Sequence, residues 1–129
     1  MNHLTTSGLR HLALTVKNLK ACVQFYTKVL KMTIEWQPDD DNVYLTSGND
    51  NLALHRAPKD FEPAKHQRLD HLGFILKTPE DVDVWYDHFV QNNVDIKAKP
   101  RTHRDGARSF YAADPDGNIV QMIYHRPIA

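Results

Sequence analysis

The chain begins with an alternating stretch of hydrophobic and polar residues, and a helical pattern follows it. Residues 9–16 alternate, with leucines and a valine on one face and His11 on the other. Asn18 is a good N-cap, and apolar residues then recur at helical spacing to about residue 30. Three short strand patterns separated by polar turns follow, at residues 32–37, 42–47 and 51–56. This half predicts the order strand, helix, strand, strand, strand.

The same order repeats after residues 58–68, whose two prolines and mixed charges are typical of a linker. Residues 69–76 alternate as a strand. Thr78 and Pro79 then supply a cap and a first-turn proline, and Asp81 an acid at the third helical position. Three further strands are predicted, at residues 94–99, 107–113 and 118–124. The second half therefore repeats the first.

This repeat predicts an α+β fold of two tandem βαβββ modules, at about residues 7–57 and 69–125, in one domain spanning residues 1–129. Each module has a sheet with its helix on one face, and the other face needs a cover. Two such sheets are expected to curl into an open cupped barrel with the helices outside. The interior of that cup is a natural pocket for a small molecule.

Composition narrows the possible partners. Lys plus Arg equals Asp plus Glu at 16 each, so no net field favours nucleic acid or an anionic membrane. The N-terminus lacks the basic start and apolar run of a signal peptide, and no apolar segment approaches the ~18 residues of a membrane span. We therefore expect a cytoplasmic protein with a small-molecule substrate and no nucleic-acid or membrane partner.

Strand alternation directs several polar side chains away from the predicted helices and toward the cup. They are His11, His55, His71 and, if the two halves are equivalent, Gln121. Neutral imidazoles bind Zn²⁺, Ni²⁺ and Fe²⁺ well, and a glutamine carbonyl oxygen is a weaker ligand. A lone strand histidine is more often a core or pocket-lining residue, but His11 and His71 occupy matching places. Gln121 is either a ligand or a hydrogen-bonding partner of a substrate or a ligand histidine.

The segments HLALTV, LDHLGFIL and SFYAADPDGNIVQMI resemble the vicinal oxygen chelate superfamily. That superfamily includes glyoxalase I, extradiol dioxygenases, fosfomycin-resistance proteins and bleomycin-binding proteins. The resemblance implies a cup that holds a divalent metal ion (Zn, Ni, Mn or Fe), often assembled across a homodimer. It makes His11 and His71 the first-strand ligands, and Gln121 stands where the family commonly has glutamate. His55 lies on the matching strand of the first half, where Ala53 equally fits the ligand position.

The resemblance implies a metal-dependent enzyme that chelates two neighbouring oxygens of a small oxygen-rich substrate, with lyase, isomerase or dioxygenase chemistry open. Gln121 cannot accept a proton as a glutamate does, so His55 is the candidate base, and these two are the candidate catalytic residues. Tyr111 resembles a phosphonate-contacting tyrosine, and Arg108 belongs to a basic cluster suited to an anion. Trp36 lines either the pocket or the core. The alternatives are a metal-free protein that binds a small molecule or antibiotic, as bleomycin-resistance proteins do, and a fosfomycin-type resistance enzyme.

Overall fold

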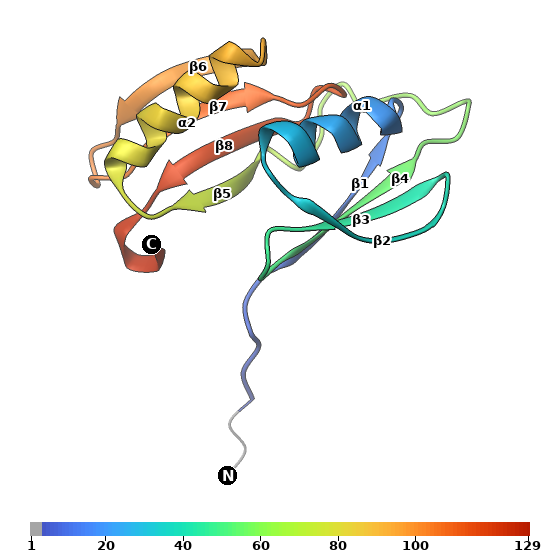
Figure 1. Cartoon of the computed structure of the whole chain (residues 1–129), viewed down its shortest axis with the longest axis horizontal. Coiled ribbons are helices and arrows are strands. Elements are labelled where there is room, and N and C mark those ends of the chain that lie inside the picture. Colours follow the sequence, from blue (N-terminus) through green and yellow to red (C-terminus); the bar gives the residue numbers. More distant parts are fainter. Residues whose placement is uncertain (1–3) are drawn as a thin grey trace. The chain divides into compact units, whose positions relative to one another are not determined.

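The computed structural model describes residues 4–129, and its contacts divide the chain into two compact units, Met1–Phe61 and Glu62–Ala129. Each unit has the predicted order of one strand, a helix and three strands (Figure 1). Within the described residues each unit holds one four-stranded mixed sheet. The α+β class and the two βαβββ modules are therefore confirmed, and the division falls inside the predicted linker at residues 58–68.

The first unit closely follows the hydrophobic pattern of its sequence. Its elements are β1 (His11–Val16), α1 (Leu19–Gln24), the π-helical segment η1 (Phe25–Val29), β2 (Thr33–Asp39), β3 (Asn42–Thr46) and β4 (Asn51–Arg56). The sheet order is β1-β4-β3-β2, with β1 parallel to β4 and the other pairs antiparallel. Asn18 caps α1 by accepting a hydrogen bond from the Ala21 amide at 3.0 Å. The helical region ends near residue 30, as the apolar spacing predicts.

The second unit has the same arrangement. Its elements are β5 (Leu72–Leu76), α2 (Pro79–Gln91), β6 (Asp95–Thr102), β7 (Arg108–Ala113), β8 (Ile119–Tyr124) and the 3₁₀ turn η2 (Arg126–Ile128). The sheet order β5-β8-β7-β6 matches that of the first unit. Thr78 and Asp81 form the predicted capping box at the start of α2. No helix in residues 4–129 is long and apolar enough to cross a membrane.

Each sheet is covered by its own helix on one face. In the second unit Phe110 packs against Phe89 of α2, with ring centroids 5.1 Å apart, and is fully buried. Side chains alternate along a strand, so Ser109 and Tyr111 lie on the opposite face of β7. In the first unit the buried Leu52 and Leu54 likewise leave the odd-numbered residues of β4 on the face away from α1; these are Asn51, Ala53 and His55.

Candidate metal and substrate site

His11 begins β1, and its ring is held by a residue directly across the sheet. Asn51 pairs with His11 in the parallel register of β1 and β4, and the His11 Nδ1 lies 2.8 Å from the Asn51 Oδ1. The Asn51 Nδ2 donates to the Glu35 Oε2 at 2.8 Å. Because a carboxylate only accepts, this contact turns the Asn51 oxygen toward the ring, and the His11 Nδ1 must carry the hydrogen. The Nε2 of neutral His11 therefore holds the lone pair.

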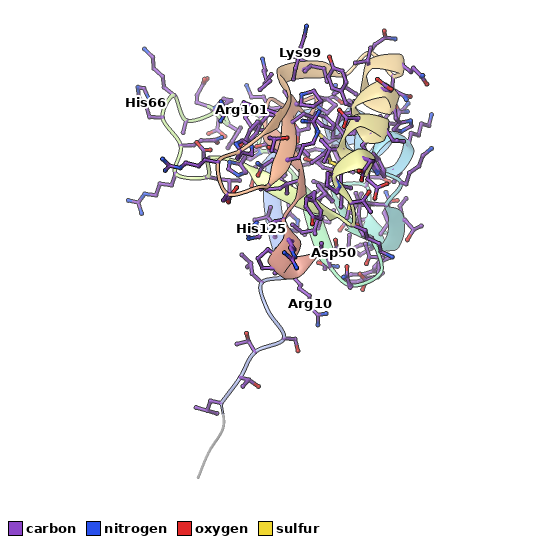
Figure 2. All side chains as sticks on the ribbon, turned by 90° about the vertical axis from the view of Figure 1, so that its left-hand side faces the viewer. Arg10, Asp50, His66, Lys99, Arg101 and His125 are labelled. Carbon is purple, nitrogen blue, oxygen red and sulfur yellow. The ribbon has the colours of Figure 1, made fainter. Side chains whose placement is uncertain are left out.

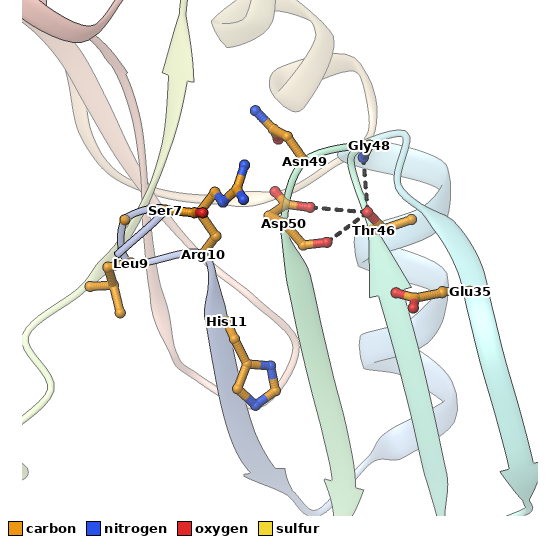
Figure 3. A pocket seen from close by; sticks show the side chains of 10 residues that line it. Ser7, Leu9, Arg10, His11, Glu35, Thr46, Gly48, Asn49 and Asp50 are labelled. Carbon is orange, nitrogen blue, oxygen red and sulfur yellow. Dashed lines mark hydrogen bonds between the residues drawn. The ribbon is translucent and has the colours of Figure 1, made fainter. Parts of the chain in front are cut away.

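The pocket beside His11 is formed entirely within the first unit. His11, Arg10, Glu35 and Asp50 are among the side chains that line it (Figure 3). Asp50 is committed to its own turn, where it accepts hydrogen bonds from Thr46 and the Ser47 amide. His11 itself is exposed at this pocket.

His55 is held in the same way by a second asparagine. Its Nδ1 lies 2.6 Å from the Asn42 Oδ1, and the Asn42 Nδ2 donates to both oxygens of Asp39 at 2.9 and 3.1 Å. The backbone amide of Asp41, with the Asn42 side chain, holds the pKa of Asp39 below its usual value, so Asp39 stays a carboxylate. His55 is thereby also fixed with the hydrogen on Nδ1 and the lone pair on Nε2.

The strand register separates His55 from His11. Asn51 is the partner of His11, and His55 lies four residues further along β4, about 13 Å at about 3.3 Å per residue. Two imidazoles on one metal, each bonded at about 2.0–2.1 Å, have nitrogens within about 4 Å of each other. Each ring is held by an acceptor directly across the sheet, so neither leans along the strand toward the other. The His11 and His55 rings of one sheet are therefore too far apart to bind the same metal ion.

Ala53, rather than His55, is the first-unit counterpart of Gln121. Ala53 pairs with Ala13 in β1, and Gln121 pairs with Gly73 in β5, two residues after His11 and His71 respectively. Because alanine has no donor atom on its side chain, the first unit offers only His11 at the positions that match His71 and Gln121.

His71 lies one residue before β5, and its ring is also oriented by an acceptor. Its Nδ1 lies 2.7 Å from the Asp70 Oδ2, which leaves the Nε2 lone pair of the neutral ring for a ligand. The Tyr111 ring meets the imidazole edge-on, with centroids 5.3 Å apart. His71 and Tyr111 are therefore neighbours on the sheet face opposite α2.

Gln121 is 7% exposed and shares that face. Its Nε2 donates to the Ser109 Oγ and to the Tyr111 hydroxyl, each at 3.0 Å, so both amide hydrogens are used. The Oε1 is the atom left for a ligand. A Cβ at Gly73 would lie 3.9 Å from this oxygen, and the glycine leaves that space open.

The three residues expected to contact the substrate fall in different places. Tyr111 lines a pocket together with Gln121. Arg108 faces α2, where it makes bonds of 2.7 and 3.0 Å to Asp83; this ion pair raises the pKa of Arg108 and lowers that of Asp83. Residues 108 and 111 are an odd number apart on one strand, so they point to opposite faces. Trp36 is 58% exposed on β2 and stacks on Tyr44 at 5.1 Å.

Sequence reasoning missed the residues that orient the histidines. Asn51 has the same parity as His55 on β4, which places it on the open face. Its contact with His11 follows only from the register between β1 and β4, which the sequence alone does not supply. Asn42 was missed for the same reason, because its contact with His55 depends on the register between β3 and β4.

The available donors fit a divalent metal of borderline softness. His11 and His71 each present a neutral Nε2, and Gln121 presents a carbonyl oxygen, both of which such metals accept. Within the described part of either unit, no three His, Cys, Asp or Glu side chains gather as a metal site. His11 belongs to the first unit, and His71 and Gln121 belong to the second.

Residues 8–122 match the model of the Glyoxalase/Bleomycin resistance protein/Dioxygenase superfamily, and the chain belongs to this superfamily. It is 27% identical over 124 residues to 3-methylcatechol 2,3-dioxygenase of Pseudomonas putida, covering 88% of this chain but only 40% of that protein. It is 28% identical over 118 residues to the glutathione transferase FosA of Serratia marcescens, covering 89% and 79% of the two chains. The structure of lactoylglutathione lyase from Agrobacterium tumefaciens shares the fold, with a TM-score of 0.76, 21% identity and coverage of 92% and 94%.

Proposed function

We propose that this protein is a metal-dependent enzyme of the glyoxalase or dioxygenase type, acting on a small oxygen-rich substrate. The observation that carries the proposal is the matched orientation of His11 and His71. Each lies at the same place in its module, and each has its Nδ1 on an acceptor and its Nε2 lone pair free. Metal-ligating histidines almost always donate their other ring N–H to an acceptor, and the matched places of His11 and His71 in the two modules distinguish this pair from His55.

In this proposal His11, His71 and the Gln121 Oε1 hold a divalent ion, which is Zn, Ni, Mn or Fe. When bound, the metal supplies Lewis-acid polarisation of two neighbouring substrate oxygens. The protein shell is incomplete, which leaves positions for those oxygens. Gln121 is neutral, so it orients without accepting a proton.

His55 is the candidate proton acceptor rather than a ligand, and this role requires a substrate that spans the distance of about 13 Å along β4 between the levels of His11 and His55. The Asp39–Asn42 pair places the hydrogen of the neutral ring on Nδ1 and leaves the Nε2 lone pair available to a proton. Proton abstraction of this kind belongs to lyase or isomerase chemistry. Dioxygenase chemistry would use the same ligands and leave His55 as a contact to substrate oxygens.

A metal-free binding protein is the second candidate, and the neutral Gln121 favours it. The proposed ligand set contains no carboxylate, which weakens the binding of a hard dication. A chain that sequesters an antibiotic or another small molecule has no need of a metal at this place. A fosfomycin-type resistance enzyme would share the proposed metal site, and the similarity to FosA of Serratia marcescens supports testing fosfomycin as a substrate. We also propose a cytoplasmic homodimer, with the two sheets completing one cup within or between chains.

Metal titration separates the candidates. Chelator-stripped protein is titrated with Zn²⁺, Ni²⁺, Mn²⁺ and Fe²⁺ against a competing chromophoric chelator, and bound metal is counted by elemental analysis. We expect about one ion per chain in the wild type and large losses in His11→Ala and His71→Ala. His66→Ala, which changes an exposed histidine in the linker, is the matched control. Failure of all four metals to bind, or equal binding in the three variants, would refute the proposal of a metal-dependent enzyme.

A further inference from the structure

The second unit contains a pocket of about 800 Å³ that opens next to Gln121. The side chains that line it include Tyr111, Gln121, Arg101, His103, Arg104 and His125. Figure 2 labels Arg101 and His125. Asp105 is the acidic residue among its lining groups. The pocket is therefore lined both by the candidate metal ligand Gln121 and by mostly basic side chains.

A chain of hydrogen bonds links Arg101 to Gln121. The Arg101 guanidinium donates to the His103 Nδ1 at 3.2 Å, and the His103 Nε2 lies 2.8 Å from the Ser109 Oγ. Because arginine only donates, His103 carries its hydrogen on Nε2 and donates to Ser109. Ser109 also accepts from the Gln121 Nε2. Arg101 is thus held at the pocket by the same network that orients Gln121.

Asp105 offsets only part of the positive charge of the pocket. Asp105 turns its carboxylate back to the Ala107 amide at 3.0 Å, a contact that also lowers the pKa of Asp105. Arg104 makes no ion pair or hydrogen bond within residues 4–129, and Arg101 has further donors beyond the one used on His103. Arg108, by contrast, is already paired with Asp83 on the opposite sheet face. Two guanidinium groups therefore remain available to an anion.

We propose that this pocket binds an anionic oxygen group, a carboxylate or a phosphoryl-type group, through Arg101 and Arg104. The planar fork of an arginine matches either group, and two guanidinium groups favour a ligand with negative charge at one end. The role of this group as part of the substrate rests on the proposed function. Binding of the anion itself does not require metal, so the two can be tested separately.

The test uses the full chain after metal removal, with acetate and methylphosphonate as separate probes. Binding is followed by ¹⁵N–¹H NMR at constant ionic strength, with chloride as the reference anion. We expect saturable shifts at Tyr111, Ser109 and the 101–107 segment, with one probe preferred over the other. The double variant Arg101→Gln/Arg104→Gln should weaken binding about tenfold or more, because two charge-assisted contacts are lost. Lys99→Gln, which removes a positive charge from β6 outside the pocket lining, should retain wild-type affinity.

Three outcomes would overturn the proposal: no saturable shift in the wild type, shifts spread over all basic surfaces, or equal weakening in Lys99→Gln and the double variant. The wild-type shifts decide the matter even if a variant folds poorly. Loss of anion binding with intact metal titration would reject this pocket and leave the proposed metal site standing. Anion binding without any metal binding would support the pocket and reject the metal-dependent function.

Discussion

Replacing Asn51 by leucine removes the acceptor that fixes the His11 ring while keeping a side chain of similar size. The His11–Asn51 contact is 2.8 Å long and partly exposed, so its net contribution is about 0.5–1.5 kcal/mol. This corresponds to an about 2- to 13-fold change in the preference for hydrogen on Nδ1 over Nε2. Loss of a residue that orients a metal-binding histidine typically costs about 10–100-fold in metal affinity. Because His11 is exposed, we expect about tenfold for Asn51→Leu.

Two readouts check this prediction. Long-range ¹⁵N–¹H NMR of the metal-free protein reports which His11 nitrogen is protonated, and chelator competition reports Zn²⁺ affinity. Glu35→Gln is the matched control, because its amide oxygen still accepts from the Asn51 Nδ2 and keeps Asn51 in place. An unchanged His11 tautomer in Asn51→Leu would refute the reasoning about orientation. A changed tautomer with unchanged Zn²⁺ affinity would show that His11 is not a ligand.

Three further outcomes follow from single contacts. Gln121→Glu should raise divalent-metal affinity, since the two hydroxyls that now accept from the amide can donate to a carboxylate; unchanged affinity would exclude this side chain from the metal shell. The pKa of Asp83 is lowered by Arg108, so their pair adds stability above about pH 4 that is lost as the pH falls through the lowered pKa. Asp83→Asn should thus lower the urea midpoint at pH 7 and converge with the wild type in acid, and a gap independent of pH would contradict this. Thr78→Ala should cost about 1 kcal/mol in urea unfolding through loss of the α2 cap, and no loss would contradict the capping role.

The hydrophobic pattern was sufficient to predict the architecture, because each element carries its own local signal. Thr78 and Pro79 marked the start of α2 correctly, and alternation located every strand to within a few residues. The π-helical end of the first helix left no such signal. There the Leu30 amide bonds to the Phe25 carbonyl, and the Thr27 hydroxyl bonds back to the Val23 carbonyl, which depends on local backbone geometry.

The site was predictable only where a side chain follows from alternation alone. Parity placed His11 and His55 on the sheet face away from the helix, and the equivalence of the two halves placed Gln121 there. Parity also puts Arg108 and Tyr111 on opposite faces of β7. The prediction that both contact the substrate overlooked this, because Arg108 was grouped with the neighbouring basic residues. The distance between His11 and His55 needs the pairing register between strands, which a single sequence does not reveal.

The most direct test of the account is a count of imidazole ligands by X-ray absorption spectroscopy of the zinc-loaded protein. We expect two imidazoles per zinc in the wild type, one in His11→Ala and one in His71→Ala. His55→Ala should leave the count at two, because the strand register keeps His55 away from His11. Three imidazoles in the wild type, with one lost in His55→Ala, would contradict the proposal that His11 and His71 bind the metal and His55 does not.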